Sequence, residues 1–133
     1  MDRYKVAIVD DDELSLDNLA FGLQKFEDFH VEGTARNGAS GKKLIAKVHP
    51  DLLFLDVELP DMRGMDLLDS IRESLTWDMK VVFYTAYDKY LLQALRESAF
   101  DYLLKPFTTE ELDGIIERYR KAMVTHQVTP SFS

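Results

Sequence analysis

The stretch KVAIVDDD (residues 5–12) decides the fold, because a run of mostly β-branched residues ends abruptly in three carboxylates. Two similar runs follow, LLFL (52–55) and VVFYT (81–85), and two weaker ones lie at 31–35 and 102–104. Each strong run is continuously apolar, which is typical of strands covered on both faces. The pattern therefore predicts a parallel sheet buried between helices.

Stretches with helical spacing separate these runs. Apolar residues recur at i, i+3, i+4 and i+7 over 16–23 and 112–123, and shorter stretches of this kind lie at 44–48, 67–75 and 91–95. Strands that alternate with helices in this way form βαβ units. We therefore predict an α/β fold with an open, doubly wound sheet of five parallel strands.

Composition excludes several classes of function. The chain has 133 residues, the size of one domain, and no cysteine, which excludes disulfides, thiolate nucleophiles and cysteine-ligated metals. Acidic residues outnumber basic ones 24 to 16, and the net charge of −8 repels phosphate backbones, so this domain is not expected to bind nucleic acid directly. Neither a signal peptide nor a membrane span is visible, and we expect a cytoplasmic protein without membrane contact.

The last residues differ in character from the rest of the chain. Apolar periodicity fades after Lys121, and the segment ends in polar residues and Pro130. We expect the folded domain to cover residues 1–122. Residues 123–133 are expected to be a C-terminal tail, a frayed helix end or the start of a linker.

Polar side chains follow the predicted strands. In an open α/β sheet, ligands bind at the carboxyl ends of the strands. The polar residues at these ends are Asp10, Asp11 and Asp12, then Asp56 and Glu58, then Thr85, and finally Lys105. We expect them to converge on one edge of the sheet, although they lie far apart in the sequence.

This set of side chains suits phosphoryl chemistry. Crowded carboxylates need a cation, and hard oxygen ligands with open positions suit Mg²⁺. An ionised carboxylate beside that cation can attack a phosphoryl group and form an acyl phosphate. The lysine would neutralise phosphoryl oxygens, and the threonine hydroxyl would donate a hydrogen bond to one of them.

Each of these residues also has an ordinary structural explanation. Asp11 or Asp12 could cap the next helix, and Asp56 could be a loop residue before a turn. Thr85 could simply end its strand, and Lys105 could be solvated. Their joint placement at four strand ends favours a functional site.

Together these motifs resemble the receiver (CheY-like) domain of two-component response regulators over about residues 4–119. The motifs are Val9-Asp10-Asp11, Leu55-Asp56 with Pro60 and Gly64 downstream, Thr85-Ala86, and Lys105-Pro106-Phe107. The stretches 85–90 and 101–107 are similar to the LytTR subfamily, whose members carry a DNA-binding domain after the receiver. The resemblance implies a (βα)5, flavodoxin-like fold and a two-component phosphorelay function in transcription regulation.

The resemblance also implies a role for each residue at the strand ends. Asp56 would be the phosphoryl acceptor, Thr85 would bond the phosphoryl group, and Lys105 would pair with it. The implied Mg²⁺ ligands are Asp11, Asp10 (directly or through water), Asp56 and the backbone carbonyl of Glu58.

Further features follow from the same resemblance. The Lys105-Pro106 bond is expected to be cis. Tyr102 matches the aromatic switch position of the family. The ring at that position turns inward as Thr85 moves, and this changes the face formed by the fourth helix, fifth strand and fifth helix. Tyr102 could equally be a half-buried tyrosine with a solvated hydroxyl. Glu58 and Tyr87 would flank the path of the water that attacks the acyl phosphate.

Three functions remain open at this stage. The favoured one is a phosphoacceptor switch, not a turnover enzyme, that reacts with a sensor histidine kinase near its first helix and the loop after its fifth strand. Phosphorylation could also produce a homodimer, and DNA would be bound through a C-terminal domain. The second function is a haloacid-dehalogenase-like phosphatase, which would need an aspartate at the position of Glu58. The third is a non-phosphorylated interaction module, but such modules usually lack one of the site residues, and all of them are present here.

Overall fold

The structure, a computed structural model, describes residues 3–86 and 99–128, with side chains described as far as Val124. The predicted helix at 91–95 and Tyr87 lie outside the described residues. The elements in chain order are β1 (Tyr4–Val9), α1 (Glu13–Leu23), β2 (Phe29–Ala35), α2 (Gly38–Val48), β3 (Leu52–Leu55), α3 (Gly64–Ile71), the 3-10 turn η1 (Arg72–Ser74), β4 (Lys80–Thr85), β5 (Asp101–Leu104) and α5 (Thr109–Val128).

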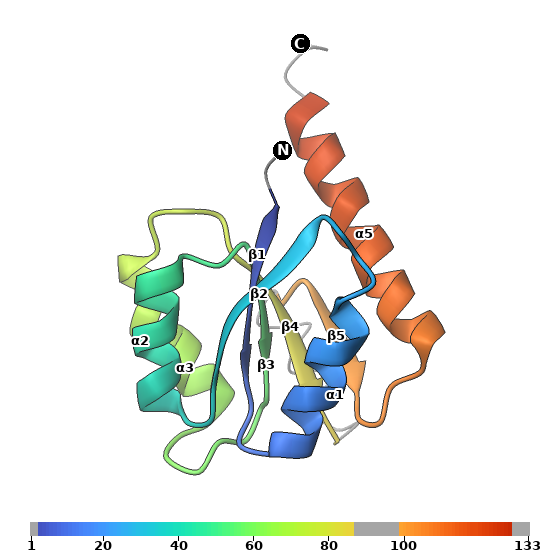
Figure 1. The fold of residues 1–133 in the computed structure, drawn as a ribbon. Helices are drawn as coiled ribbons and strands as arrows, with labels where there is room; N and C mark the ends of the chain where they lie inside the picture. Colours follow the sequence, from blue (N-terminus) through green and yellow to red (C-terminus); the bar gives the residue numbers. More distant parts are fainter. Residues whose placement is uncertain (1–2, 87–98, 129–133) are drawn as a thin grey trace.

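The five strands form one parallel sheet in the order β2-β1-β3-β4-β5 (Figure 1). The predicted sheet is therefore confirmed, and each strand begins within two residues of its expected start. The chain first adds β2 on one side of β1 and then adds β3 on the other. This reversal makes β1 and β3 neighbours at the point where open α/β sheets bind ligands.

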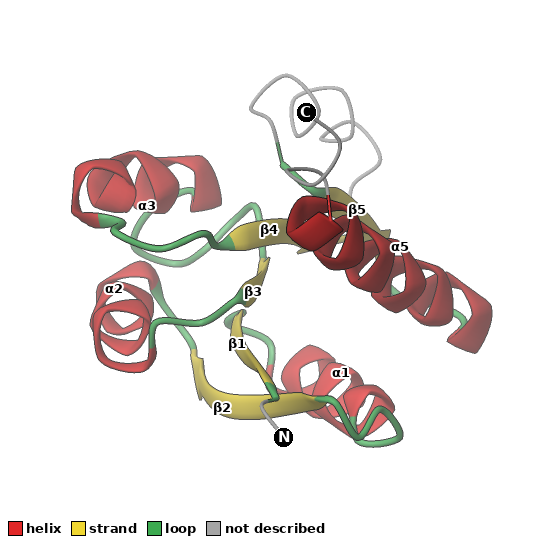
Figure 2. Cartoon of the chain, turned by 90° about the horizontal axis from the view of Figure 1, so that it is seen from above, coloured by secondary structure: helices red, strands yellow, loops and turns green. Residues whose placement is uncertain are grey.

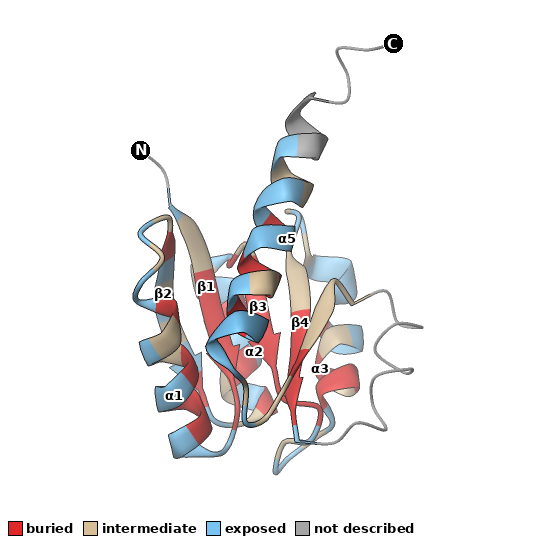
Figure 3. Cartoon of the chain, turned by 90° about the vertical axis from the view of Figure 1, so that its right-hand side faces the viewer, coloured by how far each residue is buried: buried red, intermediate tan, exposed pale blue. Residues whose placement is uncertain are grey.

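Helices cover both faces of the sheet. Figure 2 shows α1 and α5 on one side and α2 and α3 on the other. Successive strand residues point to opposite faces, so Ile8 and Phe54 pack with α1 and α5, whereas Val9 and Leu55 pack with α2 and α3. All four of these side chains are fully buried, and Figure 3 shows the same burial along the central strands. This explains why the strand sequences are continuously apolar.

The helix ends follow local capping chemistry. Asp12 caps α1 by accepting a hydrogen bond from the Ser15 amide. This is the ordinary structural explanation predicted for Asp12. The N-cap of α2 is Asn37, which accepts from the Ser40 amide. The predicted helix over 67–75 is shorter than expected, because α3 ends at Ile71 and the chain continues as a 3-10 turn. In contrast, α5 extends to Val128.

Trp77 has a structural explanation that the sequence does not provide. Its ring stacks on the exposed His49 ring, with centroids 3.9 Å apart, and its indole Nε1 donates to the Pro50 carbonyl at 2.7 Å. This contact lies at the end of the sheet opposite the acidic residues. Among the described residues, no helix combines the length and apolar character needed to cross a bilayer.

Candidate functional site

The predicted site residues meet at the carboxyl edge of the sheet. Asp10 follows β1, Asp56 follows β3, Thr85 ends β4 and Lys105 follows β5 (the lower edge in Figure 1). Backbone hydrogen bonds extend the strand ladder to them: the Asp56 amide donates to the Val9 carbonyl at 2.9 Å, and the Lys105 amide donates to the Thr85 carbonyl at 2.8 Å. The sheet itself therefore fixes the spacing of these residues.

Lys105 is the cation at the centre of the site. Its Nζ lies 2.6 Å from Asp10 Oδ2 and 3.3 Å from Asp56 Oδ2. It also lies 4.9 Å from the centre of the Tyr84 ring, a favourable cation–π position. Since Lys105 is only 14% exposed, it is not the solvated lysine of the ordinary structural explanation.

Three carboxylates form the acidic part of the site. Asp10, Asp11 and Asp56 each offer an oxygen within 4.8 Å of the others. Asp10 and Asp56 are buried, whereas Asp11 is exposed. The buried Asp10 Oδ2 is the oxygen that makes the ion pair with Lys105. One lysine charge does not balance three carboxylates, and this oxygen-rich cluster, open to solvent at Asp11, fits a hard cation such as Mg²⁺.

Burial and neighbouring charges set the protonation of the acceptor candidate. Burial raises the pKa of Asp56 to about 6; the positive charge of Lys105 opposes the rise, and the negative charge of Asp10 adds to it. Burial by itself lowers the pKa of Lys105, but its contact with Asp10 and the charge of Asp56 outweigh this, and the pKa is raised. Asp56 is therefore mostly ionised and Lys105 charged at neutral pH.

The loop after β3 is held tightly against Asp56. The Glu58 amide donates to Asp56 Oδ1 at 3.2 Å, which brings the Glu58 backbone to the site. Gly64 closes the loop, because its amide donates to the Val57 carbonyl at 2.6 Å. A Cβ at Gly64 would lie 2.5 Å from the Asp56 carbonyl oxygen, so only glycine fits there without a shift.

The remaining predicted residues divide into two groups. Thr85 is buried at the end of β4, within the site, whereas Asp12 is exposed and binds Ser15 instead of joining the carboxylate cluster. Tyr102 is partly buried on β5, where it pairs with Phe83 and packs in the α2–α3 core cluster. The Lys105-Pro106 bond is cis, as predicted.

Two contributors to the site were missed by the sequence analysis. Tyr84 lies under Lys105, and its hydroxyl donates to the Ser15 carbonyl of α1 at 3.1 Å. Arg36, after β2, donates from Nε and one terminal nitrogen to the Asp11 carbonyl at 3.3 and 3.0 Å. Neither is part of a recognisable motif; only their positions near strand ends could have indicated a role.

A groove of about 910 Å³ adjoins the site between α1 and the loop after β5. Its lining includes Lys105, Pro106 and Phe107 on one side and residues of α1 on the other. Two α1 side chains in the lining, Leu14 and Phe21, are 67% and 75% exposed. Such exposure of large apolar side chains beside a polar site is typical of a protein-binding surface.

Comparisons with known proteins agree with this geometry. Residues 6–117 match the family described as the response regulator receiver domain. The transcriptional regulatory protein BtsR of Escherichia coli K12 is 37% identical over 117 residues, which cover 88% of this chain and 48% of BtsR. An uncharacterized response regulatory protein of Vibrio cholerae is 40% identical over 111 residues, 84% of this chain and 46% of that protein. The chain thus spans about half the length of these curated relatives.

Solved structures lead to the same fold. The response regulatory domain of the Klebsiella pneumoniae protein mrkE superposes with a TM-score of 0.79 at 26% identity, covering 89% of this chain and 96% of that one. The REC domain of AraT from Geobacillus stearothermophilus gives 0.82 at 27% identity, covering 93% and 98%. Both likenesses extend across nearly the whole of each solved domain.

Proposed function

Because this chain belongs to the response regulator receiver family, a family of phosphorylation signalling switches, we propose that Asp56 accepts a phosphoryl group from a histidine kinase. The observation that carries the proposal is the position of Lys105, which forms ion pairs with both Asp10 and Asp56. Asp11 completes a carboxylate cluster beside this pair. A buried nucleophile, a cation and hard metal ligands thus share one site.

The reaction we propose uses Asp56 as an ionised nucleophile. One carboxylate oxygen attacks phosphorus, an O–P bond forms, and the N–P bond to the donor imidazole breaks; the electron pair stays on that nitrogen, which takes up a proton. Lys105 lies within reach of the new oxyanions, and the Thr85 hydroxyl would donate to one of them. No general base is required, because the pKa of Asp56, about 6, already leaves it ionised at neutral pH.

The metal site in this proposal consists of Asp10, Asp11, Asp56 and the backbone carbonyl of Glu58. When bound, Mg²⁺ supplies positive charge close to the phosphoryl oxygens. The donor set supports this assignment, since it contains only hard oxygen ligands and its three carboxylates are not balanced by the single charge of Lys105.

We infer the partners and the output from the same family. The sensor histidine kinase would dock on the α1 groove, where Leu14 and Phe21 are exposed next to the site. Phosphorylation would be read through Thr85 and Tyr102 on the face of β5 and α5 and could favour a homodimer. The protein would act in the cytoplasm as a switch that phosphorylates and slowly dephosphorylates itself, without turnover of a small substrate.

The proposed output of the switch is DNA binding by a further domain. BtsR is named a transcriptional regulatory protein and is about twice as long as the matched region. We propose that residues 1–122 form the receiver and that 123–133 lead to a LytTR-type DNA-binding domain. The acidic receiver would then regulate DNA binding without contacting DNA itself.

The acceptor is tested by intact mass after incubation with acetyl phosphate, with Mg²⁺ or with a chelator. Wild type is expected to gain one phosphoryl group of about 80 Da only with Mg²⁺, and Asp56→Asn is expected to gain none. Asp69→Asn, which changes an exposed carboxylate on α3, is the matched control and should react like wild type. An adduct that persists in Asp56→Asn would show that another residue is the nucleophile.

A wild type that stays unmodified by acetyl phosphate is then incubated with phosphorylated histidine kinases. Transfer to Asp56 from one of them supports a receiver that accepts only from its kinase. No transfer from any kinase would favour the non-phosphorylated interaction module instead.

A further inference from the structure

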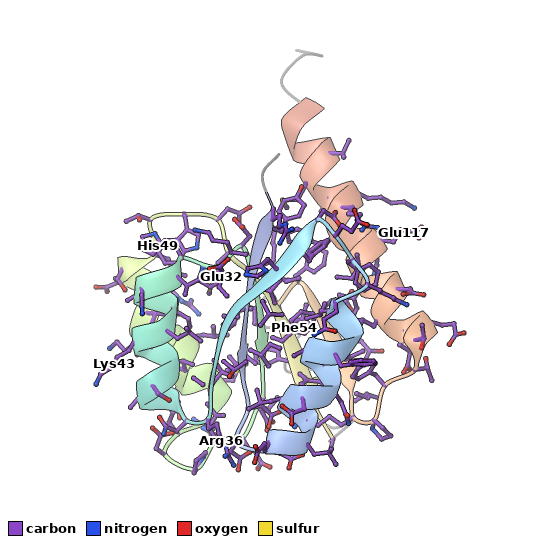
Figure 4. All side chains as sticks on the ribbon, in the orientation of Figure 1. Glu32, Arg36, Lys43, His49, Phe54 and Glu117 are labelled. Carbon is purple, nitrogen blue, oxygen red and sulfur yellow. The ribbon has the colours of Figure 1, made fainter. Side chains whose placement is uncertain are left out.

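Residues 36–39, called here the 36–39 turn, comprise the connection after β2 and the first two residues of α2, and they contact both acidic loops of the site. On one side, Arg36 donates two hydrogen bonds to the backbone carbonyl of Asp11, at 3.3 and 3.0 Å. Figure 4 shows Arg36 at the end of β2, where α1 and α2 begin. Its guanidinium therefore holds the backbone of the one exposed carboxylate in the metal-binding cluster.

On the other side, the turn binds the loop that follows Asp56. The Asp61 carboxylate accepts from the Gly38 amide at 2.7 Å and from the Ala39 amide at 3.0 Å. These bonds lower the pKa of Asp61, so it stays ionised at neutral pH. The next residue, Met62, covers Gly38 so closely that a Cβ there would overlap the Met62 side chain. The loop and the turn are thus packed as well as hydrogen-bonded.

We propose that Arg36 and Asp61 are positioning residues for the metal site, and this inference rests on the function proposed above. Asp11 follows β1 and Glu58 follows β3, and the register of this strand pair extends only as far as Val9 and Leu55, before either loop. The 36–39 turn joins them through side-chain bonds to each. Outer contacts that orient metal ligands commonly contribute 10–100-fold in metal affinity.

A purely structural role predicts a different result. Asn37 already caps α2 through the Ser40 amide, and Asp61 adds bonds to the two preceding amides. If Asp61 served only to cap the helix, its removal would lower stability and leave the affinity for Mg²⁺ unchanged. The decisive quantity is therefore the dissociation constant for Mg²⁺, measured together with the melting temperature of the metal-free protein.

The experiment measures Mg²⁺ binding by isothermal titration calorimetry for wild type, Asp61→Ala, Asp61→Asn and Arg36→Lys. We expect Asp61→Ala to bind about 10-fold more weakly and Arg36→Lys a few-fold more weakly. Asp61→Asn loses the charge but keeps one acceptor oxygen, so its affinity should fall between wild type and Asp61→Ala. In acetyl phosphate assays, the half-saturating Mg²⁺ concentration should rise while the rate at saturating Mg²⁺ stays close to that of wild type.

Charge-matched controls lie on the outer side of α3 and η1. Asp69 and Arg72 form an exposed ion pair at 3.1 Å, so Asp69→Ala and Arg72→Lys repeat the same chemical changes away from the site. Both should bind Mg²⁺ within about twofold of wild type. If Asp61→Ala does not fold, Asp61→Asn and Arg36→Lys decide the question.

Three negative outcomes are distinguishable. Wild-type Mg²⁺ affinity in the folded variants would overturn the positioning role and leave the proposed function intact. Equal weakening in Asp61→Ala and Asp61→Asn would assign the effect to charge, and this too would overturn the positioning role. A wild type that does not bind Mg²⁺ would overturn the proposed metal site, and this inference with it.

Discussion

Asp56 is a buried carboxylate whose charge opposes folding. Its pKa is raised from 3.8 to about 6, chiefly by burial, so the folded state binds more protons than the unfolded state between about pH 4 and pH 6. Stability therefore falls as the pH rises through this range, and the penalty is complete above it. We predict that Asp56→Asn stabilises the metal-free protein by about 1–3 kcal/mol at pH 8. Urea denaturation in chelator measures the difference.

The pH dependence is the internal control for this prediction. The advantage of Asp56→Asn should shrink strongly at pH 4, where folded Asp56 is protonated, and disappear only well below 3.8, the ordinary pKa that Asp56 has in the unfolded state. Lys105 keeps Asp10 as its partner in the variant, so no lysine charge is left unpaired. An equal gain at pH 4 and pH 8 would refute the electrostatic explanation.

Gly64 tests how tightly the acceptor backbone is held. A Cβ there would meet the Asp56 carbonyl oxygen at 2.5 Å and the Leu55 side chain at 3.2 Å, and the carbonyl oxygen, as a backbone atom, cannot move without moving the strand end. We predict that Gly64→Ala costs about 1–3 kcal/mol of stability and slows phosphorylation by acetyl phosphate. Gly114→Ala on α5, where the nearest atom belongs to the flexible Arg118 side chain, is the matched control and should leave the rate unchanged. A normal rate in Gly64→Ala would show that the loop relaxes freely.

At the scale of elements, the sequence predicts strands better than helix ends. Buried parallel strands must be apolar on both faces, so runs such as residues 52–55 are visible without any structure. The end of α3 at Ile71 was missed, because apolar spacing continues to Leu75, which still packs in the core although the backbone there is no longer α-helical. Capping at Asp12 was foreseen only as one of two alternatives, since the identity of a residue does not show where its side chain points.

The N-terminus of α2 provides a test at this scale. Asn37 accepts from the Ser40 amide at 2.8 Å, the bond that defines the N-cap of the helix. We predict that Asn37→Ala lowers stability by about 1 kcal/mol, whereas Asn37→Asp retains most of it, because aspartate is an equally good cap. Thermal denaturation of the two variants in chelator measures this. Equal losses in both variants would mean that the amide nitrogen of Asn37, and not its capping oxygen, matters.

At the scale of the whole molecule, topology explains why the site could be predicted at all. Parallel strands end at one edge, so Asp10, Asp56, Thr85 and Lys105 had to converge once the sheet was assigned. The contacts that could not be predicted join parts of the chain that are far apart in the sequence: Arg36 to Asp11, Asp61 to α2, and Tyr84 to α1. Their geometry depends on how far each side chain reaches across the edge, and no spacing in the sequence encodes that distance.

Metal binding should couple the site to the stability of the entire domain. The carboxylate cluster exists only in the folded state, because Asp10, Asp11 and Asp56 are brought together by β1 and β3. A ligand that binds only this state stabilises it by mass action, by about 2.7 kcal/mol at 100 times its dissociation constant. We predict that Mg²⁺ raises the melting temperature of wild type and that chelator reverses the rise.

Asp11→Asn separates site binding from general screening of the net charge of −8. Asp11 is exposed, so its removal should change the metal-free melting temperature little while abolishing most of the Mg²⁺ effect. Sodium chloride at matched ionic strength should not reproduce that effect, because screening acts on all exposed charges alike. If Mg²⁺ stabilised Asp11→Asn as much as wild type, the ion would be binding elsewhere, and the three-carboxylate cluster would not be the metal site.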